Sequence, residues 1–159
     1  HVLKWIDPNF IKYSWLDRGS DERQYCAPGI DLPIASILRT KYGRYPEYHT
    51  SLDNLENVVT PKGLDGGYWA IRKAIEAIER NKKYKITVLC EPQMGKRGLY
   101  PTLSTKGTNK EVLLMMNFIS FCDGQTSLLE IAESLNLPIW ELYELVDKLE
   151  SHSLIGVNE

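Results

Sequence analysis

A short apolar run at residues 32–38 lies between two loops that are rich in chemically capable side chains. The loop before it carries Asp21 and Glu22, and the loop after it carries His49 and Asp53. An apolar run of this length, flanked by Pro and charged residues, is typical of a buried strand. Loops at strand ends are where an α/β sheet usually builds its site. The sequence therefore predicts an α/β fold with acidic groups and an imidazole at opposite ends of one strand.

Three further segments fit the same fold class. Residues 11–16 alternate between apolar and polar side chains, as a strand with one buried face does. Residues 21–26 are expected to form a short helix, with Ser20 as its N-cap. Residues 84–90 form the clearest strand in the sequence.

A long helix is predicted to begin at Thr60 and Pro61, which suit the N-cap and first helical positions, and to end near Asn81. Apolar residues recur within it at three- and four-residue intervals, which indicates one apolar face. These residues are Leu64, Tyr68, Ile71, Ile75 and Ile78.

The last third of the chain predicts a separate helical unit. Three helices are expected, at residues 110–122, 127–135 and 138–151, and residues 154–157 could start a wing. Ser127 and Glu130 fit the capping box that opens the second helix. The expected division is therefore an α/β portion at residues 1–106 and a winged helix-turn-helix-like domain at residues 107–159.

Composition and charge argue against a nucleic-acid-binding, membrane-spanning or secreted protein. The net charge of −2 gives no general attraction to nucleic acid or to an anionic membrane. No apolar run approaches the roughly 20 residues that span a bilayer, and the first residues lack the layout of a signal peptide. The three cysteines have no C-x-x-C spacing, which predicts reduced thiols and a cytoplasmic setting. His1, an unusual first residue, fits a fragment of a longer protein, and no other role is expected for it.

Three motifs carry a resemblance to a known family. Residues 17–26, 46–51 and 90–98 resemble the aminopeptidase-like proteins of bacteria and archaea that are often encoded beside polysaccharide-biosynthesis genes. Those proteins share the fold of zinc-dependent aminopeptidases and glutaminyl cyclases. The resemblance implies the C-terminal portion of a zinc-aminopeptidase-like mixed-sheet domain, followed by an all-α winged-helix-like domain. It also implies that most of the aminopeptidase-like domain lies upstream of this chain.

The resemblance assigns roles to several residues. His49 matches a histidine ligand of zinc, and Asp21 matches an aspartate that lines the catalytic pocket. Glu22 stands where many relatives have histidine, and it is the second candidate catalytic residue. Asp53 matches a residue that braces the loop. Two zinc ions are implied for the full-length protein, with the remaining ligands upstream and weak or absent binding by this chain alone, because a catalytic zinc needs three protein ligands.

Substrate contacts are expected from Arg18, Arg23 and Tyr48. The two arginines could clamp a substrate carboxylate, or they could form ion pairs with the neighbouring acids. Tyr48 belongs with Tyr42 and Tyr45 to a cluster that could wall the substrate site or merely pack the loop. The Gly-Lys-Arg-Gly run at residues 95–98 is not a P-loop, since it lacks the first Gly and the Ser or Thr after Lys. The resemblance implies no role for that run.

Three functions are compatible with these sequence features. The first is a metallo-aminopeptidase-like hydrolase that cleaves a peptide or amide bond in a small peptide, aminoacyl or amino-sugar substrate. The others are a catalytically dead scaffold and a winged-helix module that binds a protein or a second copy of itself. From Thr126 onward there are seven acidic residues against one lysine, a net charge of −6, which predicts that the last helices do not bind nucleic acid. No membrane partner is expected.

Overall fold

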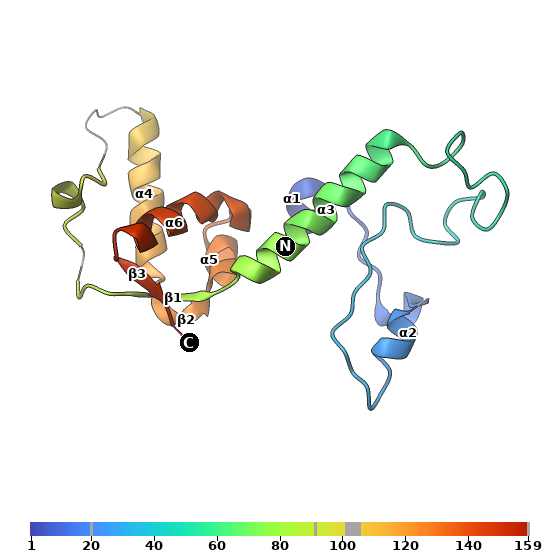
Figure 1. Cartoon of the computed structure of the whole chain (residues 1–159), viewed down its shortest axis with the longest axis horizontal. Coiled ribbons are helices and arrows are strands. Elements are labelled where there is room, and N and C mark those ends of the chain that lie inside the picture. Colours follow the sequence, from blue (N-terminus) through green and yellow to red (C-terminus); the bar gives the residue numbers. More distant parts are fainter. Residues whose placement is uncertain (20, 91, 101–105, 159) are drawn as a thin grey trace. The chain divides into compact units, whose positions relative to one another are not determined.

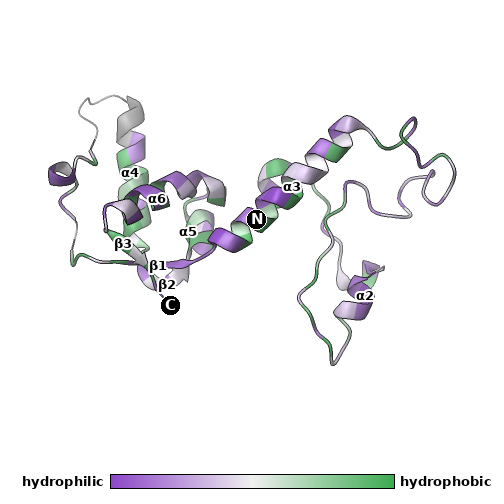
Figure 2. Ribbon diagram, in the orientation of Figure 1, coloured by the Kyte–Doolittle hydropathy of each residue, from purple (hydrophilic) through white to green (hydrophobic). Residues whose placement is uncertain are grey.

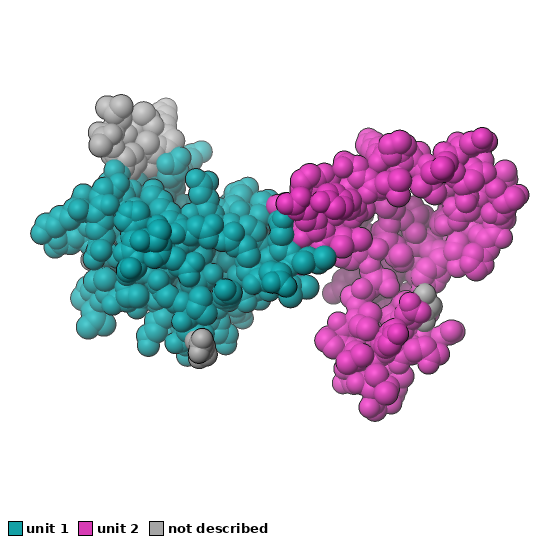
Figure 3. All heavy atoms as spheres, viewed as in Figure 1, with its two compact units in different colours: residues 1–2, 75–159 teal, residues 3–74 magenta. Residues whose placement is uncertain are grey.

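The computed structural model describes residues 1–19, 21–90, 92–100 and 106–158, with the backbone alone for residues 106–109. The chain divides into an N-terminal unit, residues 3–74, and a C-terminal unit, residues 75–159 with residues 1–2 (Figure 3). The division falls inside the long helix α3, Pro61–Arg80. None of the described helices is both long and apolar enough to cross a lipid bilayer.

The C-terminal unit is built on a three-stranded antiparallel sheet in the order β2-β1-β3. Tyr84 in the central strand pairs with Val157, and its side chain is 3% exposed. Helices pack around the sheet (Figure 1). The strands are β1 (Lys83–Ile86), β2 (Asp123–Ser127) and β3 (Ile155–Val157). The helices are α4 (Lys106–Ser120), α5 (Leu128–Ser134) and α6 (Tyr143–Ser151), with the 3₁₀ turns η2 (Met94–Arg97) and η3 (Ile139–Leu142).

One hydrophobic core holds this unit together. Its members come from every helix and from β1 and β3, and burial of their apolar surface is the main stabilising contribution. The side chains that are completely buried are Phe118, Leu128, Ile131, Ala132, Ile139, Leu142, Val146, Leu149 and Leu154. The helix-turn-helix pattern and the wing are therefore confirmed, and the third predicted helix is resolved into η3 followed by α6.

The division of the chain differs from the one expected at residue 106. The strand expected at residues 84–90 falls within the predicted α/β portion, but β1 lies between β2 and β3 and so belongs to the sheet of the C-terminal unit. Asn81 and Lys82 also form hydrogen bonds with that unit. The Leu128 N–H donates to the Lys82 carbonyl at 2.9 Å, and the Leu129 N–H donates to Asn81 Oδ1 at 2.9 Å. Residues from the end of α3 onward are thus part of the winged-helix unit.

The N-terminal unit consists of α1 (Val2–Ile6, which begins in the other unit), η1 (Trp15–Asp17), α2 (Glu22–Tyr25), long loops and most of α3. Helix α3 begins where it was predicted to begin, and the Gly63 N–H donates to the N-cap oxygen, Thr60 Oγ1, at 3.1 Å. The Ser20 cap predicted for α2 lies outside the described residues. Figure 2 shows hydrophobic residues spaced along the loops and along α3.

The two strands predicted in this unit are wrong. Residues 11–14 and 32–38 run without regular structure, and η1 replaces the end of the first. A strand needs a neighbour for its backbone hydrogen bonds, and among the described residues of this unit none supplies a ladder. Ile11 and Leu38 are consequently 71% and 47% exposed. The apolar stripe of α3 is exposed as well, with exposed fractions between 49% at Ile71 and 77% at Ile78.

Candidate functional site

Glu22 is the most densely bonded of the predicted site residues. It opens α2, and its Oε1 accepts hydrogen bonds from the Gly19 N–H at 3.0 Å and from the Tyr42 hydroxyl at 3.1 Å. Its Oε2 accepts from the Ser36 hydroxyl at 3.3 Å. An ionised carboxylate is an acceptor only, so all three contacts favour the charged form. The Glu22 carboxylate therefore ties three separate loop segments together.

The hydrogen bonds also set the protonation of the groups involved. The bond from the Gly19 N–H is the main cause that lowers the pKa of Glu22 below its usual value, with smaller effects from Tyr42 and Ser36. Burial and then the Glu22 carboxylate raise the pKa of the Tyr42 phenol. A Cβ at Gly19 would come within 2.5 Å of the Tyr42 hydroxyl oxygen, so only glycine allows this approach. The Tyr42 hydroxyl is thus held as the hydrogen-bond donor, and the Glu22 carboxylate is held as the ionised acceptor.

His49 lies at the other end of the same group of loops. Its backbone has φ of +59°, a conformation in which non-glycine residues are uncommon, and its side chain is exposed. The imidazole stacks on the Tyr48 ring with centroids 4.0 Å apart and planes 17° apart. Tyr48 in turn lies 6.2 Å from the Tyr42 ring and 5.7 Å from the Tyr45 ring. A row of rings therefore leads from the tyrosine that binds Glu22 to the histidine.

Asp53 completes this loop cluster. The Tyr45 hydroxyl donates to Asp53 Oδ2 at 2.9 Å, and this bond is the main cause that raises the pKa of Tyr45. The contact joins two parts of the loop, which is the bracing role expected of Asp53. We name the residues joined in this way the tyrosine cluster: Glu22, Tyr42, Tyr45, Tyr48, His49 and Asp53.

The other predicted site residues lie beside this cluster without joining it. The Arg18 guanidinium packs 4.8 Å from the centroid of the Trp15 ring and donates to the Trp15 carbonyl at 3.1 Å. Neither Arg18 nor Arg23 forms an ion pair with an acid among the residues described, so the ion-pair alternative is not the arrangement seen. Asp21 precedes α2 and makes no side-chain capping bond. These three residues are available to a ligand, but their contacts assign them no role.

A zinc site was expected to be incomplete in this chain. Nowhere in the part of the chain that the structure describes do three His, Cys, Asp or Glu side chains gather closely enough to hold a metal ion. His49 contributes one exposed imidazole, whereas a catalytic zinc needs three protein ligands. The residues present therefore do not fit a zinc ion by themselves.

Sequence reasoning missed some contacts. Ser36 gave no signal, because a lone serine in an apolar run has no periodic or motif context. His1 was expected to carry no role, but its side chain is 5% exposed: Nδ1 lies 2.5 Å from Glu133 Oε1, and Nε2 accepts from the Ile139 N–H at 2.9 Å. The contact supports the start of η3 in the C-terminal unit.

The acidic face predicted for the last helices is partly neutralised. On α6, Glu144, Asp147 and Glu150 are exposed, and Asp147 pairs with Arg80, whose guanidinium also lies 4.4 Å from the Tyr143 ring centroid. Trp140 is half-buried and packs on the core, with its ring centroid 6.4 Å from that of His1 and the two ring planes 75° apart.

Comparison with known proteins gives two related matches. A protein of Clostridium acetobutylicum, named for polysaccharide biosynthesis and for an aminopeptidase-like domain, is 40% identical over 133 residues, which cover 82% of this chain and 30% of that protein. A crystal structure from the same organism, of a protein named as a candidate peptidase, is similar with a TM-score of 0.77 and 31% identity. It covers 98% of this chain and 34% of that one. The chain thus spans about a third of the length of these relatives.

Family models divide the chain between them. Residues 1–81 match a domain of unknown function, DUF4910, and residues 82–157 match a winged helix-turn-helix family. The junction at residues 81 and 82 agrees with the place where the structure begins the winged-helix sheet. The resemblance to aminopeptidase-like proteins is confirmed by both relatives. The chain therefore belongs to the DUF4910 family, and its DUF4910 domain is followed by a winged helix-turn-helix unit.

Proposed function

We propose that this chain is the C-terminal part of a zinc-dependent aminopeptidase-like hydrolase that cleaves a peptide or amide bond, and that it is inert alone. The observation that supports this most is the likeness to a candidate peptidase over 98% of the chain at 31% identity. The tyrosine cluster is consistent with this proposal. Its loop carries the exposed imidazole of His49, and the rings of Tyr48 and Tyr42 connect that imidazole to the ionised Glu22 carboxylate.

The residues have distinct parts in this proposal. His49 supplies one zinc ligand, and the other ligands come from the portion of the longer protein that this chain does not include. Zinc, when bound, would polarise the scissile carbonyl and the attacking water. Asp21 lines the pocket, Arg18 and Arg23 bind a substrate carboxylate, and Tyr48 forms a wall beneath His49. Glu22 holds Tyr42 and the loops in position, which its three hydrogen bonds support better than a proton-transfer role.

The test compares the 159-residue chain with the longer polypeptide that contains it. We expect the longer polypeptide to hold zinc and to hydrolyse an aminoacyl-nitroanilide, with activity lost on chelation and restored by zinc. The chain alone should show neither property. His49→Ala in the longer polypeptide should lower zinc content and activity together, whereas His152→Ala, a change at an exposed histidine of α6's C-cap, should alter neither.

Other results would reject the proposal. A longer polypeptide with no zinc and no activity would favour the catalytically dead scaffold instead. Chelator-sensitive hydrolysis by the 159-residue chain would show that the ligand set is complete without upstream residues. Full zinc content after His49→Ala would remove His49 from the metal site.

A further inference from the structure

A cavity of about 780 Å³ lies within the N-terminal unit and is lined by no member of the tyrosine cluster. Its walls come from α1, the loop at residues 7–13, the loop at residues 36–44 and the middle of α3, so one unit forms it alone. One lining residue, Ser36, donates to Glu22 and so connects the cavity wall to the tyrosine cluster. We name this feature the basic cavity.

The lining of the basic cavity carries more positive than negative charge. Arg39, Lys41 and Arg44 line it against a single acid, Asp7, which gives the lining a net charge of +2. None of the three cations forms an ion pair among the described residues. The Asp7 carboxylate instead accepts from the Asn9 N–H at 2.9 Å.

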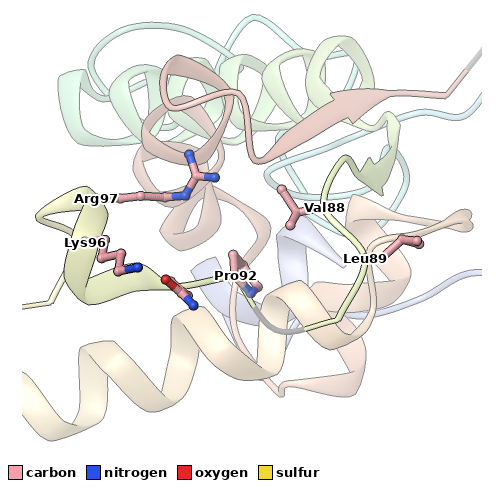
Figure 4. A pocket seen from close by; sticks show the side chains of 6 residues that line it. Val88, Leu89, Pro92, Lys96 and Arg97 are labelled. Carbon is pink, nitrogen blue, oxygen red and sulfur yellow. The ribbon is translucent and has the colours of Figure 1, made fainter.

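A smaller pocket, of about 390 Å³, lies in the C-terminal unit in the segment that follows β1. Figure 4 shows Lys96 and Arg97 extending from η2 toward the loop that carries Val88. Glu91, in the same stretch of chain, lies outside the described residues. In the N-terminal unit the residue outside the described part is Ser20, which carries no charge. The charge of the basic cavity is therefore fully described, whereas that of the smaller pocket is not.

Two of the cations gather around one aromatic ring. The Lys41 ammonium lies 4.4 Å from the Tyr42 ring centroid and 5.3 Å from that of Tyr13. The Arg44 guanidinium lies 5.9 Å from the same Tyr13 centroid. Like charges held this close repel each other, and an anion bound beside them relieves that repulsion.

The third cation is placed by two glycines of α3. A Cβ at Gly66 would lie 3.0 Å from Arg39 Nη1, and a Cβ at Gly67 would lie 3.9 Å from Arg39 Cγ. The Arg39 side chain therefore lies along the helix surface where side chains are missing. Arg39 is nevertheless exposed, so its guanidinium can donate two parallel N–H groups to an oxyanion.

The remaining wall of the basic cavity is largely apolar. Phe10, Ile11, Leu38 and Ile71 all line it and remain exposed, so a ligand with an apolar part would remove their surface from water. The volume falls in the range of small-molecule sites. A phosphate monoester carries close to two negative charges at neutral pH, which matches the lining, whereas a carboxylate carries one. We propose that the basic cavity binds a small phosphate monoester with an apolar body.

The proposal does not depend on peptidase activity, and it is tested on the 159-residue chain by isothermal titration calorimetry in phosphate-free buffer. Phenyl phosphate should bind saturably, with one ligand per chain. Benzoate has the same ring with one charge, and inorganic phosphate lacks the ring, so each should bind at least tenfold more weakly. Equal binding of either compound, or no saturation at millimolar phenyl phosphate, would overturn the proposal.

Variants identify the side chains responsible. Arg39→Gln and Arg44→Gln should each weaken phenyl phosphate binding at least tenfold. Lys62→Gln, which removes an equal charge from an exposed position of α3 outside the cavity, should change it less than twofold. Ile71→Thr should weaken the binding of phenyl phosphate but not of inorganic phosphate, because it removes apolar surface and no charge. Far-UV circular dichroism of all four variants should match the parent, since these side chains are exposed. An equal loss in Lys62→Gln would show a general effect of charge and reject the cavity as the site.

Discussion

At the scale of single residues, the Glu22 carboxylate makes the N-terminal loops sensitive to acid. Its folded pKa is lowered by the Gly19 N–H, so the contact stabilises the fold above the unfolded pKa of about 4.3 and is lost as pH falls through the lower folded value. We expect the Gly19 amide resonance to shift with a midpoint below pH 4.3 or so. Glu22→Gln should abolish this shift. A midpoint at or above the unfolded value would contradict the hydrogen-bonding account.

The three cysteines should differ sharply in reactivity. Cys122 is 2% exposed, and burial raises the pKa of its thiol to about 12, so almost no thiolate exists at neutral pH. Cys90 is exposed, and the Cys26 thiol is half-buried and donates to the Ile34 carbonyl at 3.3 Å. In a disulfide-reagent assay two thiols should react in the folded chain and the third only in denaturant. Cys90→Ser should remove the fastest phase, and uniform reaction of three thiols would show that the core is open.

At the scale of elements, α5 depends on a complete capping box. The Ser127 hydroxyl accepts from the Glu130 N–H, and the Glu130 carboxylate accepts from the Ser127 N–H at 2.8 Å. Ser127→Ala should lower the free energy of unfolding by about 1 kcal/mol, because it removes an N-cap acceptor. Urea unfolding followed by far-UV circular dichroism measures this loss. Ser120→Ala, which removes a hydroxyl that donates to the Asn117 carbonyl three residues back, is the control and should cost much less.

The elements also show which features a sequence can predict. The start of α3 and the cap of α5 were predicted correctly, because their signals lie within four residues of one another. Strand β2 was missed: its residues are polar, and it exists through pairing with β1. The Asp123 carboxylate starts it by accepting from the Gln125 and Thr126 N–H groups, and Gly124 adopts φ of +81° there. Pairing partners distant in sequence leave no local signal.

The candidate site was predictable to a similar extent. Family motifs pointed to Glu22 and His49, and the structure places both in the tyrosine cluster. The link between them passes through Tyr42 and Tyr48, whose ring contacts depend on how the loops fold back on one another. The bonds from Ser36 and Gly19 depend on the same folding. Such contacts are set by tertiary packing, so residue type alone could not identify them.

At the scale of the whole molecule, the revised unit boundary changes the charge balance of the winged-helix unit. Residues 82–157 contain eight Lys or Arg against nine Asp or Glu, so the unit is close to neutral. The basic residues of its first strand, Lys83 and Lys85, are exposed on β1. The exposed face of α6 is acidic. In a DNA-binding helix-turn-helix motif, the second helix of the motif, which is α6 here, approaches the DNA phosphates. Acidic side chains on that helix repel the phosphates.

We therefore still expect no DNA binding by this unit. A gel-shift assay with mixed duplexes at low salt should show no retardation at micromolar protein. Glu144→Lys with Glu150→Lys should introduce weak binding that disappears as salt rises, because phosphate contacts displace counterions. Retardation by the unchanged chain would show that β1 and its flanking lysines, not α6, face the nucleic acid.

The central place of β1 also determines where this gene can recombine. A junction at residue 107 would transplant α4 to β3 but would leave behind the strand with which both β2 and β3 pair. A junction before Asn81 would carry that strand together with the Asn81 and Lys82 groups that bond the start of α5. Of the two, only the second keeps the three-stranded sheet intact in a new host protein. Random gene fusions selected for folded product should accordingly recover junctions upstream of residue 81 and none between residues 87 and 106.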